Sequence, residues 1–216
     1  MKNLVIYGAG GFAREVALLI DQINEVLPTW NLVGYIDDNL SNEGKMLNGY
    51  PVLGDIGWFN NYNNEINVVL GIGCPSIKEK IVDKLQLMES IEFPNIIHPT
   101  VRLSPYNNFG KGIIICEGNI LTCNIDVGDF VILNLNCTIG HDTVLENYCT
   151  ILPNASISGN VKLGKGVEFG TNGTIIQGIN VGENSIIGAG AVVVKDLPSN
   201  CTAIGMPAKP IKFHNI

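Results

Sequence analysis

Charged side chains are scarce in this sequence of 216 residues, where they make up 15% of the chain, against about 25% in an average soluble domain. Acidic residues outnumber basic ones by 20 to 13, which gives a net charge of -7. No basic surplus is available to neutralise the phosphates of a nucleic acid, so we expect no nucleic-acid partner. An anionic ligand must therefore be held by a local site.

Long apolar runs are also missing. No run approaches the roughly 18 residues that span a bilayer, and residues 1–7 do not have the layout of a signal peptide. We expect a cytoplasmic protein with no membrane span.

Metal-ligand patterns are absent as well. The histidines His98, His141 and His214 lie at separations unsuited to a shared zinc ion, which excludes a carbonic-anhydrase-like site and predicts no bound metal. His98 precedes a proline and is expected to make a structural contact. No CxxC pair occurs, so we expect the cysteines to be reduced packing residues: Cys74, Cys116, Cys123, Cys137, Cys149 and Cys201.

The first 95 residues alternate short apolar runs with helical patterns. The expected elements are a strand over 4–7, a helix over 12–26, a strand over 32–36, a polar loop over 39–50, a strand over 68–73 and a helix from about 75 to 88. This order predicts a small, Rossmann-like α/β domain with a parallel sheet over residues 1–95.

After residue 95 the sequence repeats every six residues. One position of each hexad is apolar: Ile97, Leu103, Phe109, Ile115, Leu121, Val127, Leu133, Ile139, Leu145, Ile151, Ile157, Leu163, Phe169, Ile175, Val181, Ile187 and Val193. Three residues later Gly, Asn or Asp recurs: Gly112, Gly118, Asn124, Asn136, Asp142, Asn154, Asn160, Gly166, Asn172, Gly178, Asn184, Gly190 and Asp196. These types best tolerate left-handed backbone angles, so each hexad is expected to hold one short strand and one turn. Three hexads then form one rung of a triangular prism with the apolar column inside and no inserted loop.

Residues one rung apart are predicted to stack at the inter-strand distance of about 4.8 Å. His141 is the only histidine inside the repeat, and Gly159 lies one rung above it. Histidine accepts and returns protons near neutral pH, as general-base catalysis requires. Asp142 stands in the turn column, and the sequence leaves open whether it serves only the turn or also supports His141.

Eight motifs are spread along the chain: residues 7–12 (YGAGGF), 36–38 (IDD), 70–73 (LGIG), 97–99 (IHP), 140–142 (GHD), 158–160 (SGN), 187–192 (IGAGAV) and 204–209 (IGMPAK). In this order the chain resembles the bacterial sugar acetyltransferases of the PglD/NeuD family. The resemblance implies an α/β domain that binds a nucleotide sugar over residues 1–95. A left-handed parallel β-helix of hexapeptide repeats with a C-terminal tail would follow over 96–216.

The resemblance also implies acetyl transfer from acetyl-CoA to a sugar. His141 would take a proton from the attacking group, Asp142 would support it, and the Gly159 amide would bind the oxyanion of the tetrahedral intermediate. No protein nucleophile would be needed.

The same family likeness places acetyl-CoA, the co-substrate, along the prism. It would lie near Thr150, Thr171 and Ala189, in a cleft between the subunits of a homotrimer. Several relatives have a second histidine where this chain has Thr150, which can donate one hydrogen bond but carries no charge.

The glycine-rich stretch 8–13 fits the pattern GxGxxG/A between a strand and a helix, which suits a pyrophosphate. An NAD(P) site is an alternative, but 95 residues leave little room for both halves of a dinucleotide fold. The resemblance instead implies a nucleotide-sugar site at six residues: Gly10, Gly11, Phe12, Asp37, Asp38 and Gly73. Many relatives have histidine in place of Phe12.

We therefore predict an enzyme that uses acetyl-CoA to N-acetylate a nucleotide-linked amino sugar for surface glycan biosynthesis. One alternative is an O-acetyltransferase for a sugar of the sialic-acid type. Another is a nucleotide-sugar-binding protein without catalytic activity, which the departures at Phe12 and Thr150 would allow.

Overall fold

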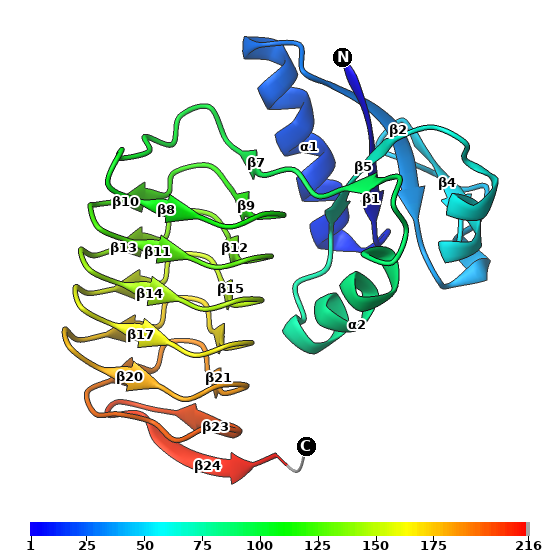
Figure 1. The fold of residues 1–216 in the computed structure, drawn as a ribbon. Helices are drawn as coiled ribbons and strands as arrows, with labels where there is room; N and C mark the ends of the chain where they lie inside the picture. Colours follow the sequence, from blue (N-terminus) through cyan, green and yellow to red (C-terminus); the bar gives the residue numbers. More distant parts are fainter. Residues whose placement is uncertain (215–216) are drawn as a thin grey trace. The chain divides into compact units, whose positions relative to one another are not determined.

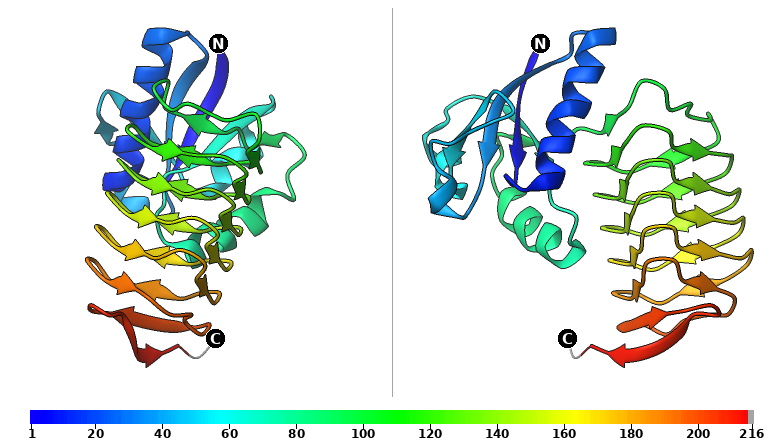
Figure 2. Two further views of the ribbon diagram at one scale, coloured as in Figure 1. Left: turned by 90° about the vertical axis from the view of Figure 1, so that its left-hand side faces the viewer. Right: turned by 180° about the vertical axis from the view of Figure 1, so that it is seen from behind.

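The computed structural model describes residues 1–214, which fold into two compact units (Figures 1 and 2). One unit comprises Met1–Gly73 and Ile77–Ile96, and the other comprises Cys74–Ser76 and the chain from Ile97 onwards. The first combines helices with a sheet, and the second consists of short strands. Among the described residues, no helix has both the length and the apolar character that a bilayer crossing demands.

The first unit is built on a six-stranded sheet of order β3-β4-β2-β1-β5-β6. Its neighbouring strands run parallel, apart from the antiparallel pair of β3 and β4. The elements are β1 (Lys2–Tyr7), α1 (Gly11–Val26), β2 (Trp30–Ile36), η1 (Leu40–Asn42), β3 (Met46–Leu47), β4 (Tyr50–Gly54), η2 (Ile56–Asn61), β5 (Ile66–Leu70), α2 (Pro75–Leu85) and β6 (Ile91–Glu92).

Sequence patterns identified the main elements of this unit but not the hairpin. The expected polar loop over 39–50 is wrong in part, because it contains η1 and β3. Asn48 and Gly49 have φ angles of 48° and 85° and join β3 to β4. An Asn-Gly pair is the preferred two-residue turn of a hairpin, and this was the missed signal. Helix α2 also ends at Leu85, three residues earlier than expected.

The order of the strands creates a ligand-binding position. Strand β1 pairs with β2 on one side and with β5 on the other, so the chain reverses its direction of winding at β1. In open parallel sheets, ligands bind beyond the carboxyl ends of the strands at such a switch point. Here those ends are Tyr7, Ile36 and Leu70.

The second unit is a parallel β-helix with three faces. The first face holds β10 (Ile120–Leu121), β13 (Thr138–Ile139), β16 (Ser156–Ile157), β19 (Thr174–Ile175) and β22 (Val192–Val193). The second face holds β8 (Asn108–Phe109), β11 (Asp126–Val127), β14 (Val144–Leu145), β17 (Lys162–Leu163) and β20 (Asn180–Val181). The third face holds β7 (Ile96–Ile97), β9 (Ile114–Ile115), β12 (Ile132–Leu133), β15 (Thr150–Ile151), β18 (Glu168–Phe169), β21 (Ile186–Ile187), β23 (Cys201–Ile204) and β24 (Lys209–Phe213).

The strands stack in the register that the repeat predicted. Thr138 pairs with Ser156 and Val144 pairs with Lys162, each 18 positions further along. From Ile115 to Val193, every residue of the predicted apolar column is buried. Leu103 is an exception, since its side chain is 45% exposed. Residues 98–107 form no strand, but this rung has no inserted residues, because His98 N donates to Ile115 O just as Cys116 N donates to Leu133 O one rung later.

The turn column adopts the expected left-handed backbone. All its predicted members except Asp196 have a positive φ. Phe130 and Tyr148 share this conformation, with φ angles of 57° and 65°, although they are bulky. Their rings lie one rung apart and stack, with centroids 5.4 Å from each other and planes 8° apart. Stacking and packing therefore override a local backbone preference at this edge.

The cysteines divide into two groups. Cys116, Cys137, Cys149 and Cys201 are buried, as expected of packing residues. Cys74 and Cys123 are exposed, so the packing assignment is wrong for them. Cys123 belongs to the same turn position as His141, one rung earlier, and that position points away from the core.

Replacing Asn154 tests the turn column. Asn154 has a φ of 60° and an exposed side chain. We expect Asn154→Ala to lower the free energy of unfolding by about 1 kcal/mol, since a Cβ without a local polar partner disfavours this conformation. Asn154→Gly should be close to neutral. Urea unfolding measures both, and an alanine variant as stable as the parent would contradict the assignment.

Candidate functional site

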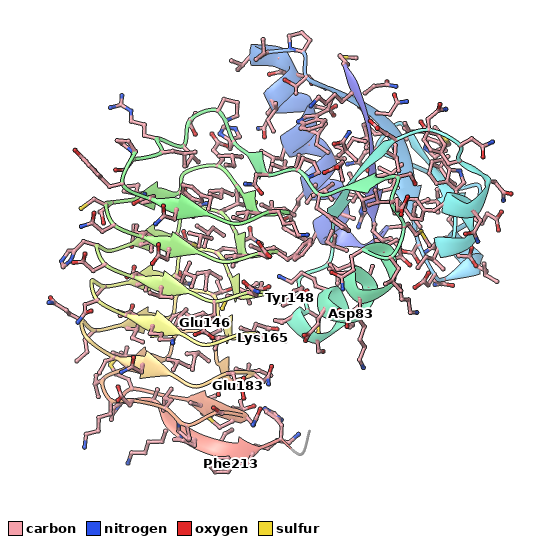
Figure 3. The ribbon with its side chains drawn as sticks, viewed as in Figure 1. Asp83, Glu146, Tyr148, Lys165, Glu183 and Phe213 are labelled. Atoms are coloured by element: carbon pink, nitrogen blue, oxygen red, sulfur yellow. The ribbon has the colours of Figure 1, made fainter. Side chains whose placement is uncertain are left out.

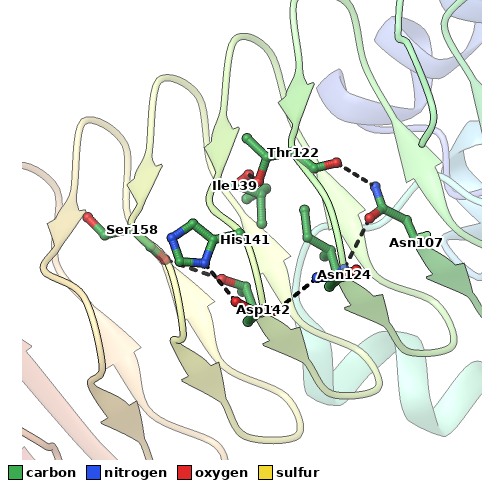
Figure 4. A network of polar contacts seen from close by, with 9 residues as sticks. Asn107, Thr122, Asn124, Ile139, His141, Asp142 and Ser158 are labelled. Atoms are coloured by element: carbon green, nitrogen blue, oxygen red, sulfur yellow. Dashed lines mark hydrogen bonds and ion pairs between the residues drawn. The ribbon is translucent and has the colours of Figure 1, made fainter. Parts of the chain in front are cut away.

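His141 lies on the turn between β13 and β14, at the edge where the first and second faces meet. Its Nδ1 is 2.8 Å from Oδ2 of Asp142, and both side chains are about half exposed (Figure 4). An ionised carboxylate can only accept a hydrogen bond, so Nδ1 carries the hydrogen of this pair. In the neutral ring, Nε2 is then left as the proton acceptor.

The second oxygen of Asp142 is held from the preceding rung. Asn124 Nδ2 donates a hydrogen bond to Asp142 Oδ1 at 3.2 Å. The hydrogen bond from His141, followed by that from Asn124, lowers the pKa of Asp142 below its ordinary value. Asp142 therefore forms a turn and also orients the imidazole. Asn124 was missed as a site residue because only its turn role was visible in the repeat.

Gly159 lies against the His141 ring, one rung above. A Cβ added to Gly159 would come within 2.6 Å of both Cε1 and Nε2 of His141, so a side chain here would collide with the ring. Gly159 is buried, and within residues 1–214 its N–H donates no hydrogen bond. An unpaired buried amide is rare and favours an external acceptor. The predicted base and the predicted oxyanion donor are thus neighbours.

The three residues expected near acetyl-CoA lie elsewhere on the prism. Thr171 and Ala189 stack at the edge between the third and first faces, where Gly190 N donates to Thr171 O at 2.8 Å. Thr150 begins β15 on the third face, and its side chain is 1% exposed. Within one chain, the first face separates Thr171 and Ala189 from His141.

The six residues expected to bind the nucleotide sugar line one cavity of about 440 Å³ in the first unit, at the switch point of the sheet. Helix α1 begins at Gly11 with Gly10 as its N-cap, and no side chain caps it. The first-turn N–H groups can therefore bind an anion such as a phosphate. Gly71 was missed by sequence reasoning, although a Cβ there would come within 2.7 Å of Ala13 and Ile6.

The two acidic residues of this cavity differ in what they contact. Asp37 accepts backbone hydrogen bonds from Ala9 at 2.7 Å and from Asn39 at 2.8 Å, so both its oxygens hold loops in place. Asp38 Oδ1 accepts a hydrogen bond from the buried Tyr7 hydroxyl at 2.7 Å. Burial, then this bond, raises the pKa of Tyr7, which keeps the hydroxyl protonated as a donor.

A larger hollow, of about 510 Å³, lies over the second face and contains none of the predicted site residues. Glu146 and Lys165, which line it, are labelled in Figure 3. Glu146 forms an ion pair with Lys162 at 2.7 Å, and Asn108 donates to Asp126 at 2.8 Å. Several of the polar side chains that line this hollow thus already have a hydrogen-bond or ion-pair partner within the chain. No cluster of three or more metal-ligating side chains occurs in the described part of the chain.

Comparisons with known proteins agree with this architecture. Residues 3–85 match the family model of the PglD N-terminal domain. The structure of PerB from Caulobacter crescentus in complex with CoA and GDP-perosamine superposes with a TM-score of 0.88 at 27% identity, over 98% of each chain. The acetyltransferase domain of PglB from Neisseria gonorrhoeae, in complex with acetyl coenzyme A, gives 0.88 at 29% identity, over 97% of this chain and 99% of that one.

Curated sequences give a similar result. GDP-perosamine N-acetyltransferase of Escherichia coli O157:H7 is 28% identical, over 96% of this chain and 95% of that protein. A putative acetyltransferase of Schizosaccharomyces pombe is 49% identical over 57 residues, which span only 25% of its length.

The fold and the similarity to named acetyltransferases along nearly the whole chain identify an acetyltransferase with a left-handed β-helix of hexapeptide repeats, as the family resemblance implied. The match of residues 3–85 to the PglD N-terminal domain and the similarity to GDP-perosamine N-acetyltransferase along nearly the whole chain support the resemblance to the PglD/NeuD sugar acetyltransferases.

The contacts of Asp142 predict how its carboxyl titrates. By carbon NMR, we expect the folded protein to hold Asp142 ionised to a lower pH than an unfolded peptide does, since its pKa is lowered. His141→Ala should raise this pKa more than Asn124→Ala, because the bond from His141 contributes most. An Asp142 carboxyl that titrates identically in the folded chain and in the peptide would contradict the geometry.

Proposed function

We propose that this protein transfers the acetyl group of acetyl-CoA to the amino group of a nucleotide-linked sugar. The observation that carries the proposal is the cluster of His141, Asp142 and Gly159, in which an oriented imidazole lies against a buried, unpaired amide. The acetylated sugar nucleotide is an activated donor for glycan assembly. A cytoplasmic role in surface glycan biosynthesis is therefore part of the proposal.

The chemistry requires a base and an oxyanion donor. The sugar amine attacks the thioester carbonyl while His141 Nε2 accepts one of its protons, and Asp142 stabilises the resulting imidazolium. The carbonyl oxygen becomes negatively charged, and the Gly159 N–H donates to it, a contribution worth about 10²–10³ in rate. Collapse of the intermediate breaks the carbon–sulfur bond. The leaving CoA thiolate takes the proton from His141, so the base is regenerated.

The bound ligands of the relatives support the choice of substrates. The Neisseria neighbour was solved with acetyl coenzyme A, and the Caulobacter enzyme was solved with CoA and GDP-perosamine. Two further Caulobacter structures carry a histidine replaced by asparagine or by alanine. In this chain, acetyl-CoA is assigned to Thr150, Thr171 and Ala189.

The nucleotide sugar is assigned to the cavity of residues 1–95. The amides at Gly10 and Gly11 suit its phosphates, and Phe12 offers an apolar surface. Asp38 contributes the carboxylate oxygen that Tyr7 does not occupy, whereas Asp37 and Gly73 shape the cavity. GDP-linked amino sugars are the first acceptors to test, because the full-length Escherichia coli relative is a GDP-perosamine N-acetyltransferase.

A homotrimer would complete the site. The first face carries no charge at its outward strand positions, which are Ile120, Thr138, Ser156, Thr174 and Val192. The second face has Asp126 and Lys162 at the equivalent positions. A three-fold axis along the first face would bring His141 of one copy to the edge that carries Thr171 in the next. We therefore propose that this face joins the subunits.

His141→Ala tests the catalytic assignment. With acetyl-CoA and a GDP-linked 4-amino sugar, we expect kcat to fall at least about 100-fold, since the base is lost. Free thiol released from CoA measures the rate, and His214→Ala is a matched histidine control. Near-parental activity in His141→Ala would contradict the mechanism. If the parental protein acetylates only sugars without an amino group, the O-acetyltransferase is favoured. If it transfers acetyl to no sugar, a binding protein is favoured.

Thr138→Lys tests the subunit interface. Three lysines would approach one another around the proposed axis, and like charges held close together repel. We expect a trimer to dissociate in analytical ultracentrifugation, with loss of activity. Val144→Lys, on the second face, should remain trimeric. A parental protein that is a monomer, or a Thr138→Lys variant that stays trimeric and active, would contradict the assignment.

A further inference from the structure

One inward column of the β-helix contains a polar side chain where its neighbours are apolar. Successive rungs place Ile125, Thr143, Val161 and Ile179 at the same position. Thr143 is fully buried. Burying a hydroxyl is unfavourable unless it makes a hydrogen bond, and valine has nearly the same shape without that requirement. The hydroxyl therefore needs an explanation beyond packing.

The hydroxyl of Thr143 acts on the peptide that carries the unpaired amide. Thr143 Oγ1 donates a hydrogen bond to Ser158 O at 3.2 Å; Ser158 is labelled near His141 in Figure 4. The carbonyl of Ser158 and the N–H of Gly159 belong to one peptide group. In a planar trans peptide these two bonds point in opposite directions. Holding the carbonyl toward the buried Thr143 thus directs the N–H away from the core.

The two adjacent rungs show that this turn can close without such a donor, whereas in the rung before them Asn107 Nδ2 donates to Thr122 O at 3.1 Å. In the two adjacent rungs, the carbonyls equivalent to that of Ser158 are those of Gly140 and Ile176, which lie opposite Ile125 and Val161. In residues 1–214, no side chain donates a hydrogen bond to either carbonyl. Two of the four rungs at this edge therefore lack the polar contact, and the two that have it use Asn107 and Thr143. Thr143 is the donor at the rung that carries the Gly159 amide.

We propose that Thr143 is a positioning residue that aims the Gly159 N–H at the oxyanion of the acetyl-transfer intermediate. This inference rests on the proposed function, in which Gly159 is the oxyanion donor. Preorganised donors stabilise a transition state because they need no reorientation during the reaction. Without the hydroxyl, the peptide can rotate, and the amide contributes less to the transition state while ground-state binding is unchanged.

A thiol elsewhere in the β-helix supplies a matched control. Cys149 Sγ makes the same type of contact, to Gly164 O at 3.2 Å, with the same separation along the chain. It lies at the edge between the second and third faces, away from His141. If such contacts serve only the fold, losing either one should have similar consequences.

Thr143→Val, Thr143→Ser and Cys149→Ala test the proposal in steady-state kinetics with acetyl-CoA and the amino-sugar nucleotide that the parental protein acetylates best. We expect Thr143→Val to lower kcat about 10-fold, a part of the contribution of a whole oxyanion donor. In Thr143→Val, the KM for acetyl-CoA, the KM for the amino-sugar nucleotide and the pH profile of kcat should be unchanged, because this substitution alters neither the ligand contacts nor the base. Thr143→Ser should restore most of kcat, and Cys149→Ala should retain it.

Several results would overturn the proposal. One is a parental kcat in Thr143→Val. Another is a loss of kcat in Thr143→Ser as large as that in Thr143→Val. A third is a loss of kcat in Cys149→Ala as large as that in Thr143→Val, which would indicate that such contacts serve only the fold. If Thr143→Val unfolds at a lower urea concentration than the parent, the kcat of Thr143→Ser shows whether the hydroxyl matters for activity, since this variant keeps the hydroxyl but not the methyl group. His141→Ala distinguishes a failure of the positioning role of Thr143 from a failure of the proposed mechanism. If His141→Ala is inactive while Thr143→Val has parental activity, only the positioning role fails. Parental activity in His141→Ala removes the proposed mechanism, and no transfer to any amino sugar by the parental protein removes the proposed function itself.

Discussion

The register of the β-helix is the constraint on which the site depends. Up to β22, each strand of the β-helix pairs with the strand 18 residues further along, and the buried apolar column prevents a shift of that pairing. A slip of one residue would turn every inward side chain outward. The fixed register brings Asn124, His141 and Gly159, which are distant in sequence, into one stack. The proposed catalytic groups therefore sit on short turns with little freedom to move.

The turns add a second constraint, because their left-handed residues also carry polar side chains. Asp142 has a φ of 58°, and the same residue holds the imidazole of His141. Turn formation and orientation of the base are thus not competing explanations for Asp142. The same holds for Asn124, which forms the turn of the preceding rung and donates to Asp142. In a fold of stacked rungs, the Asn and Asp residues that adopt the left-handed turn conformation are also well placed to make side-chain contacts between rungs.

Much of this could be predicted from sequence, for reasons that are specific to the repeat. The six-residue period identified the core column and the turn column, and the step between rungs placed Gly159 above His141. The period could not predict that Leu103 is exposed, because residues 98–107 form no strand although the register of 18 residues is kept. In the first unit, the sequence pattern could not reveal that Asp37 holds the glycine loop by accepting a hydrogen bond from Ala9 N. Thr143 was passed over because its contact with Ser158 depends on side-chain geometry inside the coil.

We propose that the oriented imidazole of His141 and the directed amide of Gly159 act together at one edge of the β-helix to acetylate an amine. A crystal structure with CoA and a GDP-linked amino sugar would show whether they do. We expect the sugar amine at about 3 Å from His141 Nε2, a hydrogen-bond distance, with the sulfur of CoA on the same side as the Gly159 N–H. An amine bound away from His141, or CoA bound at another edge, would contradict it.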